Sequence, residues 1–217
     1  MAQRRRPLIL PQGLPATPRR EERQLLQRLQ QPLADDEFRD CLYELGCFYN
    51  KFGRNDLARQ VIELLLGYCD DPQEQALCCL TLGQIAEQQK HYAAAIEHYV
   101  AGLRLRPKTK LISYLLNNNL GLCLNSEKRY AESEKFLRRA IAIDSERAAA
   151  YTNLGISLQG QGDFVGAAWA FAEAKQADPS DPRPSRLLRT LLAGRARGLA
   201  HVAHVFLRER PPAELAS

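Results

Sequence analysis

Residues 148–181 read AAAYTNLGISLQGQGDFVGAAWAFAEAKQADPSD, and this stretch decides the fold. Its pair Leu154-Gly155 occurs three more times along the chain, at Leu45-Gly46, Leu82-Gly83 and Leu120-Gly121. The successive spacings are 37, 38 and 34 residues. A self-similarity with this period is typical of helix pairs that stack side by side, each contacting only its neighbours. The sequence therefore predicts an all-α solenoid of about four stacked helix-turn-helix repeats rather than one compact core.

Close approach between helices explains the pattern. A glycine on the first helix of a pair lets its partner come near, and the second helix carries a small residue for the same reason. The glycines are Gly46, Gly83, Gly121 and Gly155, and the small residues are Ala58, Ala95, Ser133 and Ala167. Each unit buries too little surface alone, so at least about three must stack.

The composition agrees with helices, and the charge is unevenly placed. Leu, Ala, Glu, Gln and Arg, which are good helix formers, are abundant, and no period-two pattern predicts strands. The net charge of +5 resides at the ends: residues 1–24 carry +4, residues 183–217 carry +5, and the segment between them carries −4. Because the repeat body is mildly acidic, we do not expect the array to bind nucleic acid.

The chain divides into five segments. We predict a disordered, basic and Pro-rich tail at 1–18, an N-terminal helix and linker at 19–34, the repeat array at 35–182, a C-terminal capping helix region at 183–209 and a tail at 210–217. Within the array the repeats fall at about 39–72, 76–109, 114–147 and 148–181. The two longer spacings leave three and four residues to place, about one helical turn, which a longer helix or a longer loop would absorb.

Helix starts are marked by acidic and amide residues. Asp35-Asp36 and Asn55-Asp56 are expected to cap the two helices of the first repeat. Asp71-Pro72 combines a capping residue with a proline at the first helical position. At the other end, residues 184–208 have one apolar side, which predicts a helix that covers the last repeat. The alternative is a basic amphipathic contact for an acidic partner or a membrane surface.

Six cysteines lie within the helical pattern, at Cys41, Cys47, Cys69, Cys78, Cys79 and Cys123. They form no C-x-x-C motif and have no histidine at ligand spacing, so we predict reduced, structural cysteines. The alternative is a redox-sensitive pair at Cys78-Cys79. No apolar run approaches the roughly 18 residues of a membrane span, and the run at residues 8–10 is too short for a signal peptide. We therefore expect a cytoplasmic protein.

Residues 148–181 resemble a tetratricopeptide repeat from end to end. Tyr151 stands three residues before the Leu-Gly pair, a Gly-Asp-Phe turn joins the helices, Ala167 and Ala174 occupy the small sites, and Pro179 closes the unit. The second repeat matches nearly as well, the third lacks the closing proline, and the first is the weakest. The resemblance covers about residues 36–182. It implies a right-handed α-solenoid whose first helices line a concave groove for an extended or helical peptide.

The resemblance assigns groove positions to the residues that flank each Leu-Gly pair; in the first repeat these include Glu44 and Cys47. The candidate partner-binding residues are Tyr43, Asn50, Lys51, Leu80, Thr81, Gln84, Leu115, Asn118, Asn119, Leu122, Asn125, Thr152, Asn153 and Gln159. Asn119 and Asn153 directly precede Leu-Gly, and an amide that donates and accepts can pair with a peptide main chain. The alternative is that these amides serve neighbouring helices or water.

Family members that clamp a chaperone's C-terminal carboxylate use a Lys and an Asn in one repeat and a Lys and an Arg in a later one. This chain has Tyr43, Cys47, Leu115 and Asn119 at those sites. We therefore do not expect it to bind chaperone tails.

No catalytic constellation and no cofactor motif is present in the sequence. His201 and His204 lie three residues apart, but two ligands without a third do not predict a metal site. We predict a non-enzymatic interaction module or scaffold that binds a protein or peptide partner, with no metal and no cofactor. A secretion or assembly chaperone for a protein subunit, and anionic-surface or nucleic-acid contact through the Arg-rich termini, are the alternatives. A homo-oligomer is compatible with the sequence.

Overall fold

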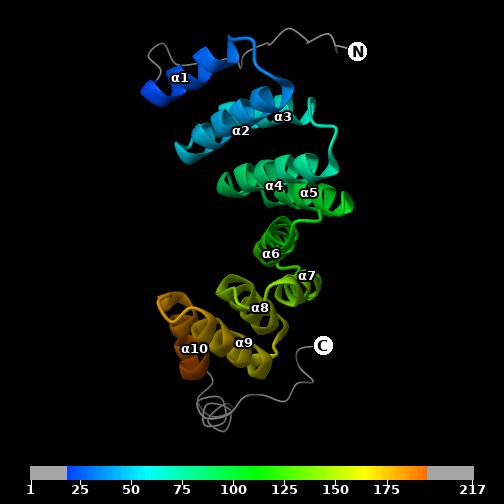
Figure 1. Ribbon diagram of the computed structural model, residues 1–217. Coiled ribbons are helices and arrows are strands. Elements are labelled where there is room, and N and C mark those ends of the chain that lie inside the picture. The colour runs from blue at the N-terminus through cyan, green and yellow to red at the C-terminus, as the bar shows by residue number, and fades with distance from the viewer. Residues whose placement is uncertain (1–18, 195–217) are drawn as a thin grey trace.

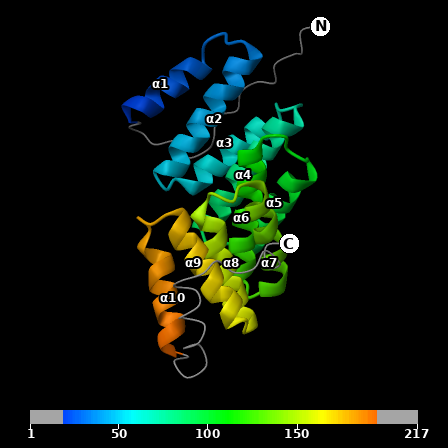
Figure 2. The ribbon, with the colours of Figure 1, turned by 60° about the horizontal axis from the view of Figure 1, so that its bottom comes forward.

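A computed structural model describes residues 19–194, and within them the chain is helical throughout, with no strand. The helices are α1 (Arg20–Leu29), α2 (Asp35–Lys51), α3 (Asn55–Leu66), α4 (Pro72–Gln88), α5 (Tyr92–Arg104), α6 (Lys110–Ser126), α7 (Tyr130–Ile143), α8 (Ala148–Gln161), α9 (Phe164–Ala177) and α10 (Pro182–Gly194). Helices α2 to α9 form four antiparallel pairs that stack in chain order (Figures 1 and 2). The predicted all-α solenoid is confirmed.

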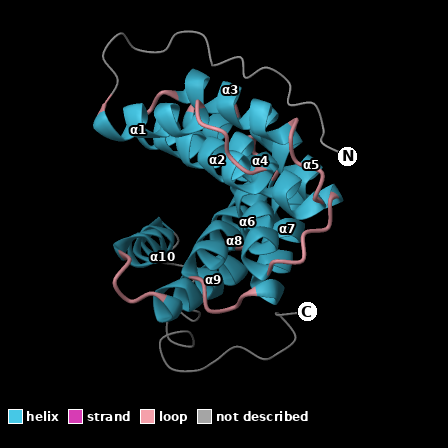
Figure 3. Cartoon of the chain, turned by 45° about the horizontal axis from the view of Figure 1, so that its top comes forward, coloured by secondary structure: helices cyan, strands magenta, loops and turns pink. Residues whose placement is uncertain are grey.

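The stack bends into an arc (Figure 3). The first helix of each pair, α2, α4, α6 and α8, lies on the inner side, and α4, α6 and α8 pack against one another in order. The second helices α3, α5 and α7 pack between successive first helices, and α9 packs between α8 and α10. This arrangement gives the array one inner face made of first helices alone.

The extra residues of the longer repeats lengthen the first helices rather than the linkers. Helices α2, α4 and α6 each have 17 residues, whereas α8 has 14. The linkers at 67–71, 105–109 and 144–147 remain short. The alternative that the sequence left open is therefore settled as about one additional helical turn.

The four glycines are packing devices. A Cβ atom at Gly83 would overlap the Tyr99 ring, and one at Gly155 would overlap the Phe171 ring. The same relation holds for Gly46 with Ile62 and for Gly121 with Leu137, so each glycine receives the residue 16 positions later. The small partners Ala58, Ala95, Ser133 and Ala167 are fully buried.

Two of the predicted helix starts are corrected. The N-cap of α2 is Ala34, and Asp35 and Asp36 lie in its first turn, where carboxylates interact favourably with the helix dipole. The N-cap of α3 is Arg54, directly before Asn55. Asp71 is the N-cap of α4 with a proline at the first helical position, as predicted, although its side chain makes no capping hydrogen bond.

A buried carboxylate attaches α1 to the first repeat. Glu22 is fully buried, and both its oxygens accept from Arg54 Nη1, at 3.1 Å and 3.0 Å. The Tyr49 hydroxyl donates to Glu22 Oε1 at 3.0 Å. Burial, with this carboxylate beside it, raises the pKa of Tyr49. No pattern in the sequence predicted this three-residue contact.

Helix α10 covers the other end of the array, in the role predicted for the C-terminal cap. Leu191 is buried, and Leu187, Leu188 and Leu192 pack against the core formed by α8 and α9. The remaining parts of the predicted scheme, residues 195–209 of the capping region and the tails at 1–18 and 210–217, lie outside the described residues. His201 and His204 lie there as well.

Candidate functional site

The inner face of α2, α4, α6 and α8 is the candidate site, because it is the surface on which successive repeats present equivalent side chains (Figure 3). Eight of the predicted groove residues are half-buried, and two are exposed. The half-buried ones are Tyr43, Asn50, Gln84, Leu115, Asn119, Leu122, Asn125 and Asn153; the exposed ones are Lys51 and Gln159.

Four of the predicted groove residues are buried and offer little surface to a partner. Leu80, Asn118 and Thr152 each precede their glycine by three residues, and all three are more than nine-tenths buried. Thr81 is buried as well, and its hydroxyl donates to the Leu77 carbonyl oxygen of its own helix at 3.0 Å. The structure corrects the candidate list here, since this position in the repeat faces other helices rather than the open inner face.

Asparagine side chains connect α6 to α8. Asn153 Nδ2 donates to Asn118 Oδ1 at 3.1 Å, and Asn118 Nδ2 donates to Asn119 Oδ1 at 3.0 Å. Asn125 Nδ2 donates to the Asn153 backbone carbonyl at 2.8 Å. The alternative in which these amides serve neighbouring helices therefore accounts for the Asn153 amide group.

A buried tyrosine extends these polar contacts to α4 and α5. The Tyr99 hydroxyl donates to Glu87 Oε2 at 2.8 Å, and the Asn119 side chain also hydrogen-bonds to this tyrosine. Burial raises the pKa of the Glu87 carboxyl above its usual value, while the Tyr99 hydrogen bond opposes that shift. The middle of the inner face is therefore a connected polar strip over a tightly packed core.

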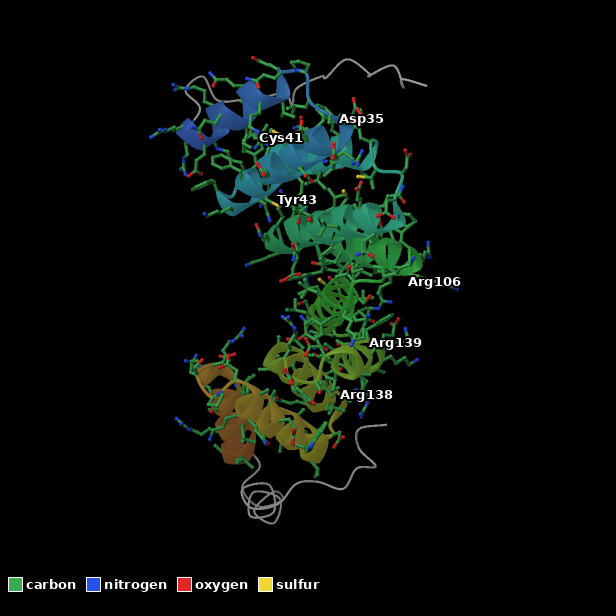
Figure 4. The ribbon with its side chains drawn as sticks, viewed as in Figure 1. Asp35, Cys41, Tyr43, Arg106, Arg138 and Arg139 are labelled. Atoms are coloured by element: carbon green, nitrogen blue, oxygen red, sulfur yellow. The ribbon has the colours of Figure 1, made fainter. Side chains whose placement is uncertain are left out.

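Near the start of the array, Tyr43 lies on the side of α2 that faces α4 (Figure 4). Burial raises its pKa to about 12, and its hydroxyl interacts with Thr81 and Cys47. A half-buried phenol and a half-buried thiol therefore lie next to each other on α2.

A pocket of about 670 Å³ lies between α1 and α2. Its lining residues are Glu21, Gln24, Leu25, Gln27, Arg28, Gln31, Glu44, Cys47, Phe48 and Lys51. Arg28 Nη1 lies 3.0 Å from Glu44 Oε2, joining the two walls through a half-exposed ion pair. Glu44, Cys47 and Lys51 are groove positions of the first repeat, so the pocket continues the inner face toward α1.

The contribution of α1 to this pocket was not foreseen from the sequence. A signal was present, because Gln24, Gln27, Arg28 and Gln31 recur at helical spacing and form one polar face. The repeat pattern begins after α1, so it assigned no function to that face.

The cysteines are free thiols, and five of the six are buried. Cys69 Sγ and Cys78 Sγ lie 4.0 Å apart, and burial raises the pKa of both thiols. Burial also raises the pKa of Cys79, so the thiolate needed for oxidation is disfavoured at the Cys78-Cys79 pair. Between residues 19 and 194, no group of three or more His, Cys, Asp or Glu side chains could hold a metal ion.

Comparison with known protein families identifies part of the repeat array. The tetratricopeptide repeat model matches residues 80–148, from the middle of α4 to the start of α8. This segment therefore matches the tetratricopeptide repeat family. Arrays of this kind serve in general as protein–protein interaction modules and are typically non-catalytic. No curated protein sequence matches the chain.

Solved structures share the fold of this chain. MamA (residues 41 to the end) from Desulfovibrio magneticus RS-1 is 19% identical, with 78% of this chain and 92% of that chain covered and a TM-score of 0.63. YrrB, described as having an unusual peptide-binding site, is 16% identical, with coverages of 88% and 95% and a TM-score of 0.62. The Hsp90 co-chaperone Cns1 from Saccharomyces cerevisiae is 21% identical, with coverages of 63% and 44% and a TM-score of 0.58.

No helix within the described part of the chain is both long enough and apolar enough to cross a membrane.

Proposed function

We propose that this tetratricopeptide repeat protein is a non-enzymatic scaffold that binds an extended peptide segment of a protein partner along its inner face. The binding surface runs over α2, α4, α6 and α8 and ends in the pocket between α1 and α2. The observation that carries the proposal is this pocket of about 670 Å³, because three groove positions of the first repeat form one of its walls.

The chemistry of the surface favours a peptide of mixed character. Half-buried Leu115 and Leu122 offer apolar contact, while Gln84 and Asn119 carry amides that suit main-chain groups. The pocket contains both signs of charge, on Glu21, Glu44, Arg28 and Lys51. A strongly acidic or strongly basic ligand would meet like charges there. YrrB, which shares the fold, is described as having a peptide-binding site, and this adds support.

The asparagine bonds change how the groove is tested. Replacing Asn153 by Ala removes the donor to buried Asn118, which costs about 1–3 kcal/mol of stability when a buried acceptor is left unsatisfied. Weaker binding by an Asn119→Ala, Asn153→Ala double variant would then have two causes, the loss of stability and the loss of contacts with the peptide. Substitutions that add bulk or charge at half-buried groove positions give a cleaner result.

The test selects ligands for the full chain from a random peptide library and measures their affinity for variants. Leu122→Lys on the inner face is expected to weaken binding by at least about tenfold, or 1.4 kcal/mol. Gln84→Arg provides a second groove variant if Leu122→Lys folds poorly. The matched control is Ala131→Lys, at an exposed position of α7. Equal affinities for the groove variants and the control would remove the inner face from the proposal.

An assembly or secretion chaperone would use the same face but would bind an unfolded subunit. A preference of the selected ligands for unfolded over folded partner would favour that role. Contact with anionic surfaces through the Arg-rich termini predicts a steep salt dependence that is lost when residues 1–18 and 195–217 are deleted. The cytoplasmic location remains a prediction, to be tested by cell fractionation.

A further inference from the structure

One edge of the array is defined by its linkers. Each repeat is an antiparallel helix pair, so the linkers at 67–71, 105–109 and 144–147 and the starts of the first helices share one side. Asp35, at the start of α2, and Arg106, in the linker before α6, lie on that side in Figure 4. We call this side the linker edge.

The linker edge is acidic at the first two repeats. Asp36 and Glu37 are exposed in the first turn of α2, and Asp70 and Asp71 are exposed in the linker before α4. The nearby Arg39 is committed to Glu74, with Nε and Oε2 3.0 Å apart. Beside these carboxylates are the half-buried rings of Phe38 and Tyr68, whose centroids are 5.2 Å apart. The acidic part therefore combines a surplus of negative charge with an aromatic patch.

The same edge is basic one repeat further along. Four exposed cations fall within seven residues: Arg104, Arg106, Lys108 and Lys110. No Asp or Glu occurs from residue 98 to residue 126, and none of the four forms an ion pair within residues 19–194.

The linker at 105–109, which carries two of these cations, has a defined shape. Arg106 adopts a left-handed backbone with φ of 50°, and the Lys108 amide donates to Gln73 Oε1 at 2.8 Å. Leu111, the residue that follows Lys110, is 46% exposed, which is high for a large apolar side chain. The basic part therefore resembles the acidic part in having an apolar side chain next to its charged groups.

We propose that the linker edge binds a second copy of this chain. In an antiparallel pair related by a two-fold axis, the acidic part of each copy meets the basic part of the other, so one charge match is made twice. Leu111 of each copy then packs near Tyr68 of its partner. Charge complementarity argues for a second copy, since both halves of the match are present on one chain. The inner face stays open, so this association is independent of peptide binding.

The test measures the association of the full-length chain by analytical ultracentrifugation. We expect a dimer at low salt that dissociates at about 1 M salt, where the Debye length falls to about 3 Å. Lys108→Glu with Lys110→Glu, and separately Asp70→Lys with Asp71→Lys, should each weaken self-association at least tenfold. Mixing these two variants should restore a dimer. The two unchanged parts are still complementary, and the reversed basic part of one variant is complementary to the reversed acidic part of the other.

The matched control reverses two exposed charges on second helices, Lys135→Glu and Lys175→Glu, and should leave the dimer unchanged. A monomeric wild-type chain, a dimer that survives high salt, or a failure of the mixed variants to associate would each overturn the proposal. Binding of a poly-glutamate peptide to a monomeric wild-type chain would overturn it as well, by assigning the basic part to an acidic partner of another kind.

Discussion

The first and fourth repeats achieve the same helix pairing by different means. In the fourth, every local device is present: the Gly155–Phe171 contact, the left-handed Gly162 turn, and the Asp163 side chain that accepts from the Gly166 amide at 2.9 Å. In the first, Gly53 also supplies a left-handed turn, but Gly46 receives the smaller Ile62, and the N-cap residue of α3, Arg54, makes no side-chain capping bond and is instead bonded to Glu22 of α1. A repeat with weak local signals is thus stabilised by a residue from outside it.

The largest predicted effect lies in the fourth repeat. Phe171→Ala removes a fully buried ring from its contact with Gly155 and should lower the free energy of unfolding by about 3–5 kcal/mol. Ile62→Ala in the first repeat removes less volume and should cost less. Urea unfolding followed by circular dichroism measures both. Val165→Ala, at an exposed position of α9, is the control and should change stability by less than about 0.5 kcal/mol. A larger loss of unfolding free energy for Ile62→Ala than for Phe171→Ala would contradict this order.

The next effect concerns the contact that supports the first repeat. Glu22→Gln keeps the side-chain shape but removes the charge facing Arg54, so stability should fall by about 1–3 kcal/mol. Hydrogen exchange should then rise in α1 and around the α2–α3 turn, while α8 and α9 keep their protection. The control is Glu21→Gln, one residue away and exposed. Unchanged exchange in α1 would mean that apolar packing alone holds this helix.

The turns offer a smaller effect in the stabilising direction. Gly53 and Gly162 have positive φ in the first and fourth repeats, and Lys90 and Lys128 occupy the equivalent turns of the second and third with φ of 60° and 59°. A left-handed backbone is costly for residues with a Cβ. Lys90→Gly and Lys128→Gly should therefore each stabilise the chain by up to about 1 kcal/mol, measured as a rise in thermal midpoint. Gly162→Ala should act in the opposite direction, and a gain from it would refute the account.

The smallest effect concerns Glu87, a half-buried carboxylate that accepts from the Tyr99 hydroxyl, whereas Glu22 beside Arg54 is fully buried. Burial raises the pKa of Glu87 in the folded chain above its ordinary value of 4.5. At a pH between 4.5 and this raised pKa, the folded chain therefore binds a proton that the unfolded chain has released. Its contribution to stability is therefore present at low pH and is lost as pH rises through the folded-state pKa. Glu87→Gln should stabilise the chain at about pH 7 and have little effect at about pH 4. A gain of equal size at both pH values would contradict this cause.

The repeat pattern predicted the close-approach residues correctly but placed some buried residues in the groove. Gly121 and Ser133 were identified as close-approach residues from sequence alone, and Ser133 Oγ donates to the Gly121 carbonyl oxygen at 2.7 Å. Asn118 and Thr152 were placed in the groove by the same repeat pattern, yet both are buried. A repeat pattern states which face of a helix a residue occupies, but not how far the next repeat covers that face.

The sequence by itself determined the helices, their pairing and the glycine contacts, because these depend on residues within one repeat that recur at a regular spacing. The tertiary structure decided the longer first helices, the α1–α2 pocket and the polar contacts between repeats. Glu22 and Arg54 are 32 residues apart, and Asn118 and Asn153 are 35 apart. Such contacts depend on the angle and distance at which one helix pair stacks on the next. Those quantities follow from packing along the whole array, which no single repeat encodes.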